Sequence, residues 1–110
     1  MKDFWIEQFK NLAIPKIIAK FKPERILIFG SRILGNANED SDIDAIIISK
    51  TFSNIPFFER MPLVLKTIKF PKHIDFFCYT PEEFKRISKS SSIIMEALEN
   101  CLEFKIGGNI

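Results

Sequence analysis

The sequence predicts an α/β (α+β) fold, a small mixed β-sheet of three to four strands packed against helices. Apolar residues at helical spacing alternate along the chain with short, β-rich runs, as expected for a sheet covered by helices. The run Ala45-Ile46-Ile47-Ile48 is apolar on both faces, which is typical of a covered central strand. The 110 residues suffice for one core, so we expect a single domain over residues 1–110, with a short flexible tail at about 107–110.

The N-terminal half contains one long helical pattern and two strand-like runs. Apolar residues recur at helical spacing over residues 3–21, where Pro15 either kinks the helix or begins a second one. Residues 25–29 and 43–49 are short β-rich runs and are interpreted as strands. The intervening residues 31–41 are rich in turn formers and have room for one helical turn.

The C-terminal half repeats the alternation of helix and strand. Residues 55–69 have a helical pattern, complicated by Pro62, and residues 73–79 are interpreted as the third strand. Serines 90–92 are suited to cap a helix that runs to about residue 100. Residues 102–106 are suited to a short edge strand.

A strong helix-start signal follows the third strand. Thr80 suits the N-cap, Pro81 the first helical position, and Glu83 can reach back as in a capping box. We therefore predict a helix over residues 81–89.

The composition is that of an ordinary globular protein, with 46% hydrophobic and 27% charged residues. A net charge of +2 does not by itself indicate nucleic acid as a direct partner. No apolar run approaches the roughly 20 residues of a membrane helix, so we expect no membrane partner. The first ten residues, MKDFWIEQFK, carry mixed charges where a signal peptide needs an apolar stretch. We therefore expect a cytoplasmic protein.

The cysteines and the histidine do not form a recognisable metal motif. The separation of Cys78 and Cys101 fits no zinc spacing, and a disulfide is not expected in a cytoplasmic protein. We expect both to be free, buried, small hydrophobic residues. The single histidine, His73, is interpreted as a strand-end residue and not as a ligand.

Three aspartates lie at the starts of predicted strands. Asp42 and Asp44 are two residues apart, so a strand would place both side chains on one face. Asp75 lies early in the next strand and reaches the same place if the two strands are neighbours. Carboxylates held together repel one another unless a cation joins them, and Mg²⁺ suits such a group. The alternatives are a polar turn entering a strand for the first two and a solvated strand end for Asp75.

A second group of residues follows the first strand. Gly30 permits close approach of the backbone to a phosphate, and Ser31 offers a hydroxyl and an N–H at the start of a turn. Arg32 adds a positive charge able to pair with phosphate oxygens. Phosphate-binding groups thus precede metal-binding groups along the chain.

Two better-known motifs are excluded. The spacing from Gly30 to Gly35 matches a P-loop, but Asn36-Ala37 replaces the Lys-Ser/Thr that binds phosphate and Mg²⁺ there. The alternating aspartates resemble the start of an EF-hand, but Ala45 replaces its turn glycine and Thr51 its final glutamate.

The order Gly30-Ser31, Asp42-x-Asp44 and Asp75 resembles the nucleotidyltransferase superfamily that includes DNA polymerase beta. Its hallmark is Gly-Ser, a linker, Asp-x-Asp at the start of the next strand, and a third acid on a later strand. The stretch GSRILGNANEDSDIDAIII more specifically resembles the minimal nucleotidyltransferases (MNT proteins), small prokaryotic single-domain members that commonly pair with a HEPN-type toxin. The resemblance covers roughly residues 14–106. It departs from the pattern at Ile33-Leu34, where a small and a basic residue often lie.

The resemblance implies a polymerase beta-like nucleotidyltransferase fold and a Mg²⁺-dependent reaction. A nucleoside monophosphate, AMP from ATP, would be transferred to a hydroxyl on a partner protein, and the chain would be the antitoxin of a HEPN-type toxin. The implied catalytic and metal-binding residues, which would hold two Mg²⁺, are Asp42, Asp44 and Asp75. The implied phosphate-binding residues are Gly30, Ser31 and Arg32.

A different class of function stays open beside the enzyme. The chain has 12 phenylalanines, which either fill the core or form a protein–protein surface. In the second case the protein would be a non-catalytic antitoxin that neutralises its partner by forming a complex. Small-molecule or nucleic-acid acceptors are a weaker alternative, and association with itself or with a partner is left open.

Overall fold

The computed structural model describes residues 3–35, 38 and 41–106, so the predicted flexible tail at 107–110 lies outside the described residues. Four strands form one sheet in the order β3-β2-β1-β4. The strand bounds are Arg25–Phe29 for β1, Ile43–Ile48 for β2, Ile74–Tyr79 for β3 and Leu102–Lys105 for β4. Strand β1 is antiparallel to β2 and β4, whereas β2 and β3 are parallel. The predicted mixed sheet is confirmed.

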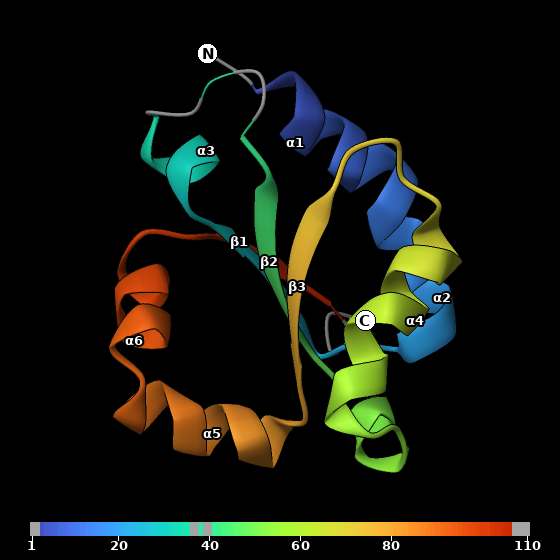
Figure 1. Cartoon of the computed structure of the whole chain (residues 1–110), viewed down its shortest axis with the longest axis vertical. Coiled ribbons are helices and arrows are strands. Elements are labelled where there is room, and N and C mark those ends of the chain that lie inside the picture. Colours follow the sequence, from blue (N-terminus) through green and yellow to red (C-terminus); the bar gives the residue numbers. More distant parts are fainter. Residues whose placement is uncertain (1–2, 36–37, 39–40, 107–110) are drawn as a thin grey trace.

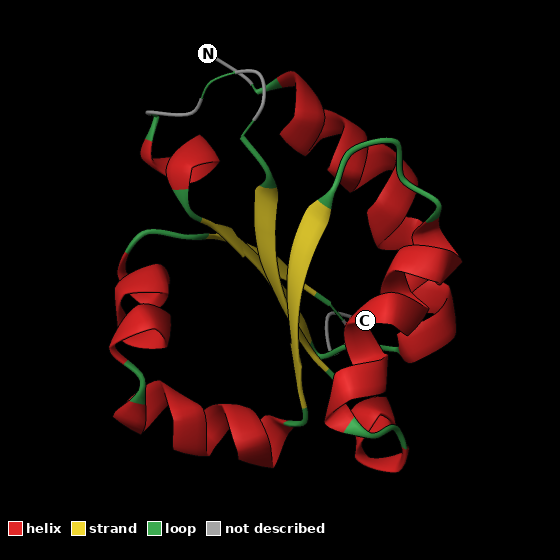
Figure 2. Ribbon diagram, in the orientation of Figure 1, coloured by secondary structure: helices red, strands yellow, loops and turns green. Residues whose placement is uncertain are grey.

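Helices cover both faces of this sheet (Figure 1, Figure 2). One face is covered by α1 (Phe4–Gln8), α2 (Ile14–Phe21) and α4 (Phe57–Ile68). The other face carries α5 (Pro81–Ser90) and α6 (Ser92–Glu99). The short helix α3 (Ser31–Leu34) directly follows β1.

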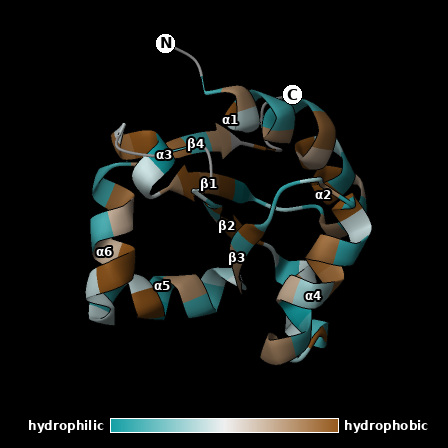
Figure 3. Ribbon diagram, turned by 45° about the horizontal axis from the view of Figure 1, so that its top comes forward, coloured by the Kyte–Doolittle hydropathy of each residue, from teal (hydrophilic) through white to brown (hydrophobic). Residues whose placement is uncertain are grey.

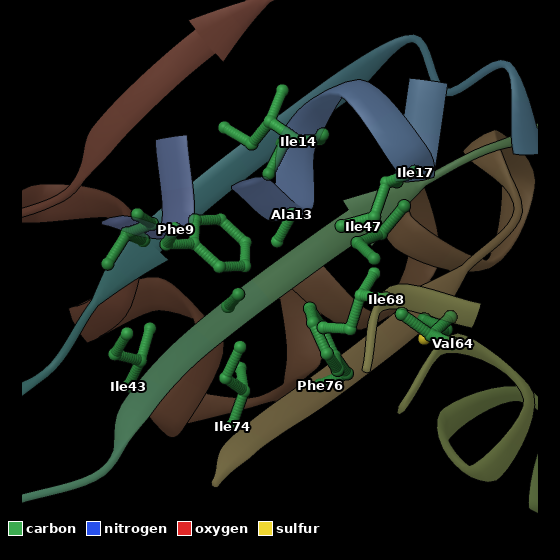
Figure 4. Packing of buried hydrophobic residues seen from close by; sticks show 14 of the residues in the cluster. Phe9, Ala13, Ile14, Ile17, Ile43, Ile47, Val64, Ile68, Ile74 and Phe76 are labelled. Carbon is green, nitrogen blue, oxygen red and sulfur yellow. The ribbon is translucent and has the colours of Figure 1, made fainter. Parts of the chain in front are cut away.

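The alternation of side chains along β2 divides the core into two parts. Ile43, Ala45 and Ile47 pack on the side of α2 and α4, as Figure 4 shows for Ile43 and Ile47. Ile46 and Ile48 join the smaller cluster on the side of α5 and α6. The predicted burial of β2 on both faces is thus confirmed. The same alternation places the side chain of Asp44, near the start of β2, on the α5–α6 side of the sheet.

The predicted helix over residues 3–21 is one helical stretch with a wide segment inside it. Residues Phe9–Ala13 are π-helical, between α1 and α2, and the N–H of Ile14 donates to the carbonyl of Phe9. Pro15 follows in the first turn of α2. Because proline lacks an N–H and its ring would collide with the carbonyl four residues earlier, the wider turn accommodates it without ending the helix.

The remaining helices begin close to the predicted residues. Thr80 and Glu83 complete the capping box of α5: the Glu83 N–H donates to Thr80 Oγ1 at 3.2 Å, and the Thr80 N–H donates to Glu83 Oε1 at 2.9 Å. Helix α4 continues through Pro62. A 3₁₀-helix, η2 (Lys50–Asn54), precedes α4 and was not predicted. It starts where the Ser49 side chain accepts a hydrogen bond from the Thr51 N–H.

The two cysteines are free, as predicted. Cys78 is buried, but Cys101 is only partly buried, because it lies in the exposed connection between α6 and β4. Colouring by hydropathy shows a largely hydrophobic β1 and helices that mix hydrophobic with hydrophilic residues (Figure 3). Among the described residues, no helix has both the length and the apolar character needed to cross a membrane.

Candidate active site

The turn after β1 is built on Gly30. Its φ is +89° and its ψ is −162°, a region of backbone conformation that is open almost only to glycine. Its carbonyl accepts hydrogen bonds from the N–H groups of Ile33 and Leu34, both at 3.0 Å. A Cβ at this position would collide with Oδ2 of Asp44. The backbone of the turn and the Asp44 carboxylate therefore touch.

The sheet brings Asp44 and Asp75 together as predicted. The two are register partners on the parallel strands β2 and β3, and Asp44 is also the register partner of Phe29 on β1. All three therefore lie on the α5–α6 face, at the end of the sheet where β1 ends and where β2 and β3 begin. Gly30 follows directly at the same end. Residues far apart in the sequence thus meet at one place.

Asp42 completes this group from the residues just before β2. Ligand atoms of Asp42, His73 and Asp75 lie within 4.8 Å of one another. Asp42 and His73 are exposed, whereas Asp75 is half-buried. Asp44 is not one of these three, and its carboxylate lies against Gly30. The structure thus places the three predicted aspartates at one end of the sheet and adds a histidine.

His73 is predicted to be a strand-end residue, and it does lie directly before β3. Its Nε2 is 2.9 Å from Oδ1 of Asp75, so it also belongs to the candidate site. The separation of His73 and Asp75 by two residues could have indicated this contact, because residues two apart at the start of a strand share a face. We missed it because a single histidine without other metal-ligand spacing is weak support for a ligand.

The electrostatics of the group suit a cation. Burial, followed by the charges of Asp75 and Asp42, raises the pKa of Asp44 above its ordinary value. The ionised form is thus disfavoured, and a bound divalent cation would relieve both the burial and the repulsion. Carboxylate oxygens are the ligands that Mg²⁺ takes in proteins. An imidazole nitrogen such as that of His73 suits Zn²⁺ and other transition metals. The donor set therefore fits a divalent metal.

Ser31 and Arg32 follow Gly30 in the short helix α3. The Arg32 side chain is only 6% exposed and forms an ion pair of 2.7 Å with Asp3. It also donates to the carbonyls of Ser41 at 2.9 Å and Asn38 at 3.2 Å. These contacts join the N-terminus of α1 to the residues that lead into Asp42. The predicted contact of Arg32 with phosphate stays a prediction, as does that of Ser31.

Comparisons with known proteins bear on this arrangement. The sequence profile of the family described as "Nucleotidyltransferase domain" matches residues 13–104. A solved structure from Sulfolobus solfataricus, provisionally described as a nucleotidyltransferase, resembles this fold with a TM-score of 0.62 at 20% sequence identity. The match covers 99% of this chain and 93% of that one, and at this identity it concerns the fold alone. No curated protein matches the chain.

Proposed function

The chain belongs to the nucleotidyltransferase domain family, and on that basis we propose that it transfers AMP from ATP to a hydroxyl on a partner protein in a Mg²⁺-dependent reaction. The partner proposed is a HEPN-type toxin, so that the chain acts as its antitoxin in the cytoplasm. One observation carries the proposal. Asp44 and Asp75 are register partners on neighbouring strands, and Asp42 and Gly30 lie at the same end of the sheet.

In this proposal, Asp42, Asp44 and Asp75 would hold one or two Mg²⁺. The bound metal would supply positive charge to the triphosphate and to the acceptor oxygen. The turn at Gly30 would let the backbone approach the phosphates, with the Ser31 hydroxyl and N–H as hydrogen-bond donors. This chain's main contribution is therefore positioning and charge stabilisation.

Asp75 is the proposed acceptor of the proton from the attacking hydroxyl. The hydroxyl oxygen forms a bond to the α-phosphorus, the bond from the α-phosphorus to the α–β bridging oxygen breaks, and pyrophosphate leaves. The contact with His73 at 2.9 Å orients the Asp75 carboxylate for this step. The product is a phosphodiester between AMP and the partner's side chain.

The test uses ATP labelled at the α-phosphate, Mg²⁺, this protein and whichever protein co-purifies with it or is encoded by the neighbouring gene. We expect label on the partner from α-labelled ATP and none from γ-labelled ATP. The double variant Asp42→Asn, Asp44→Asn is expected to lose transfer while keeping its circular dichroism spectrum. The matched control is Glu82→Gln, an exposed acid on α5, which is expected to keep full activity. Transfer that survives the double change would show that the metal assignment is wrong.

A second candidate function is an antitoxin that acts by binding alone. It is favoured by two phenylalanines exposed on α4, Phe57 at 58% and Phe58 at 77%. They line a cavity of about 210 Å³ together with Met61 and other residues. Exposed aromatic rings beside a hollow are typical of protein interfaces.

A cell-protection assay against the toxin distinguishes the enzyme from the antitoxin that acts by binding alone. Binding alone predicts that the double aspartate variant still protects, whereas Phe58→Ser does not. Phe4→Ser is the control, because Phe4 is also exposed, at 64%, but lies on α1. Loss of protection in the double aspartate variant, with the complex intact on size-exclusion chromatography, would support the enzyme.

A further inference from the structure

A cavity of about 240 Å³ opens directly beside the turn that follows β1. One wall is formed by Phe29, Gly30 and Leu34, and the opposite wall includes Ile93 and Ala97 of α6. Gly30 therefore belongs both to this cavity and to the candidate active site. None of the roles described above uses the residues that α6 contributes.

The cavity lies on the correct face of the sheet to communicate with the carboxylates. Phe29 is the register partner of Asp44, so their side chains emerge on the same face. Helix α6 covers that face, because Ile94 and Ala97 pack in one cluster with Phe29. A molecule with its phosphates at Gly30 and Asp44 can thus extend into the cavity without crossing the sheet.

Two other cavities lie in the wrong places for this purpose. One is lined by Phe76 and Cys78, which pack in the cluster on the α2–α4 side of the sheet. Another is lined by Tyr79, at the end of β3 opposite to Asp75. Neither can receive part of a ligand whose phosphates lie at the carboxylates.

The lining of the cavity suits a flat heteroaromatic ring. Phe29 offers an aromatic ring, and Leu34 and Ile93 offer aliphatic side chains that are 56% and 65% exposed. Asn100 and Glu96 add hydrogen-bonding groups at the α6 side. The asparagine amide can donate and accept, whereas the carboxylate accepts only. Bases held between apolar groups and read at their edges by an amide are a recurrent mode of recognition.

The charge of Glu96 also favours one orientation of a nucleotide. A carboxylate repels phosphate groups, so the triphosphate is disfavoured on this side and favoured at the metal-binding end. The volume is below the roughly 300 Å³ at which pockets for whole drug-sized ligands begin. The cavity therefore suits one part of a nucleotide, and that part is the uncharged one.

We propose that this cavity receives the nucleobase of the nucleoside triphosphate, with Ile93 covering the ring and Asn100 hydrogen-bonding its edge. The proposal rests on the proposed function, since it takes the phosphates to lie at Gly30 and the aspartates. It assigns base recognition to α6 and to the residue that follows it. Phosphate binding and base binding thus come from different parts of the chain.

The test compares two ligands by isothermal titration calorimetry in Mg²⁺: ATP, which has a base, and inorganic tripolyphosphate, which has none. Ile93→Trp is expected to fill the cavity from its exposed rim and to weaken ATP binding at least tenfold, leaving tripolyphosphate binding unchanged. Met95→Trp is the matched control, because Met95 is also exposed on α6, at 44%, and does not line the cavity. Asn100→Ala is expected to weaken ATP binding by a smaller factor. Circular dichroism checks that each variant is folded.

The outcomes distinguish a failure of the proposed function from a failure of the proposed base cavity. If the wild type binds neither ligand, the proposed function itself fails. If the wild type binds both with equal affinity, the phosphate site stands and the base cavity is wrong. The cavity is also wrong if Ile93→Trp binds ATP as tightly as the wild type, or weakens both ligands equally. Weakening of ATP alone by Ile93→Trp, with Met95→Trp unchanged, supports the inference.

Discussion

At the scale of single residues, the contact between Gly30 and Asp44 determines the geometry of the candidate site. Glycine is needed at position 30 for two separate reasons. Its φ of +89° with ψ of −162° suits almost no other residue, and the space beside its Cα is occupied by the Asp44 carboxylate. Gly35 lies in the left-handed helical region, with a φ of +85° and a ψ of 10°, and a Cβ there would meet no atom within 4 Å. Gly35 therefore has a milder backbone restriction than Gly30 and no collision.

Replacing Gly30 with alanine is expected to destabilise the protein by about 2–3 kcal/mol. Gly35→Ala, which introduces a left-handed alanine without a collision, is expected to destabilise by about 1 kcal/mol. Urea denaturation followed by circular dichroism measures both. Equal losses in the two variants would show that the contact with Asp44 does not matter for stability. Because the new Cβ displaces the Asp44 carboxylate, only Gly30→Ala is expected also to weaken metal binding.

Asp44 is expected to destabilise the metal-free protein. Asp44→Asn removes a half-buried charge opposite Asp75, so the free energy of unfolding without metal at pH 7 is expected to rise by up to about 1 kcal/mol. Added Mg²⁺ is expected to raise the Tm of the wild type but not that of the variant. Differential scanning calorimetry with and without Mg²⁺ measures both effects. A metal-free variant less stable than the wild type would contradict this account.

At the scale of elements, two arginines join parts of the chain that no strand pairing connects. Arg32 in α3 pairs with Asp3 at the start of α1. Arg60 in α4 is 5% exposed and pairs with Glu83 of α5 at 2.6 Å. It also donates to the carbonyl of Cys78 at 3.0 Å. Arg60 thus joins α4, β3 and α5. Because β3 is an edge strand, the Cys78 carbonyl that Arg60 binds is one that would otherwise lack a partner strand.

The pair between Arg60 and Glu83 predicts a specific pH dependence. The hydrogen bond from Arg60 holds the pKa of Glu83 below its usual range. A carboxyl with a lower pKa in the folded state contributes stability that is present above the unfolded-state pKa, about 4.3 for glutamate. That stability is lost as the pH falls through the lower folded-state pKa. Acid is therefore expected to weaken the connection between α4 and α5.

Glu83→Gln is expected to lower the free energy of unfolding by about 1–3 kcal/mol at pH 7, because the buried Arg60 charge loses its partner. The capping box of α5 can still form, since glutamine also serves at this position. The difference from the wild type is expected to shrink below about pH 4. Urea denaturation from pH 3 to pH 8 tests this, with the exposed Glu82→Gln as the control. A difference that is constant with pH would assign the loss to packing.

At the scale of the whole molecule, helices pack on both sides of the sheet and shield the residues that are buried beneath them. Cys78 of β3 is buried in the larger core cluster, and burial raises the pKa of its thiol to about 12. Cys101 is partly exposed. The reactivity of Cys101 therefore reports on the native protein, whereas the reactivity of Cys78 reports on global unfolding.

Cys101 is expected to react with a thiol reagent in the native protein, whereas Cys78 is expected to react only after global unfolding. With Cys101→Ser, labelling of the remaining thiol is expected to be at least about 10³-fold slower than in the unfolded chain, as a stability of several kcal/mol requires. Its rate is expected to rise with urea along the global unfolding curve. Labelling that is independent of urea would show that the β3 edge opens locally.

The sequence by itself determined the order and type of most elements, because hydrophobic period and caps are local properties. The run from Ala45 to Ile48 predicted a covered strand, and Thr80 with Glu83 predicted the start of α5. The sequence also indicated which residues of the candidate site to consider, since Gly30, Asp42 and Asp44 are close along the chain. It did not predict the π-helical turn before Pro15 or the 3₁₀-helix at Lys50–Asn54, because small adjustments of the backbone depend on packing against the rest of the molecule.

Tertiary structure alone decided which side chains meet. The pairing of β2 with β3 places Asp75 beside Asp44, and no local pattern fixes which strands are neighbours. The pairing also brings a ligand atom of Asp42 to within 4.8 Å of those of His73 and Asp75. The fold directs Arg32 onto Asp3 and onto loop carbonyls, and it packs α6 against Phe29 to form a cavity beside Gly30. Most of these contacts join residues distant in sequence, so their geometry is set only when the sheet and its two helical layers assemble.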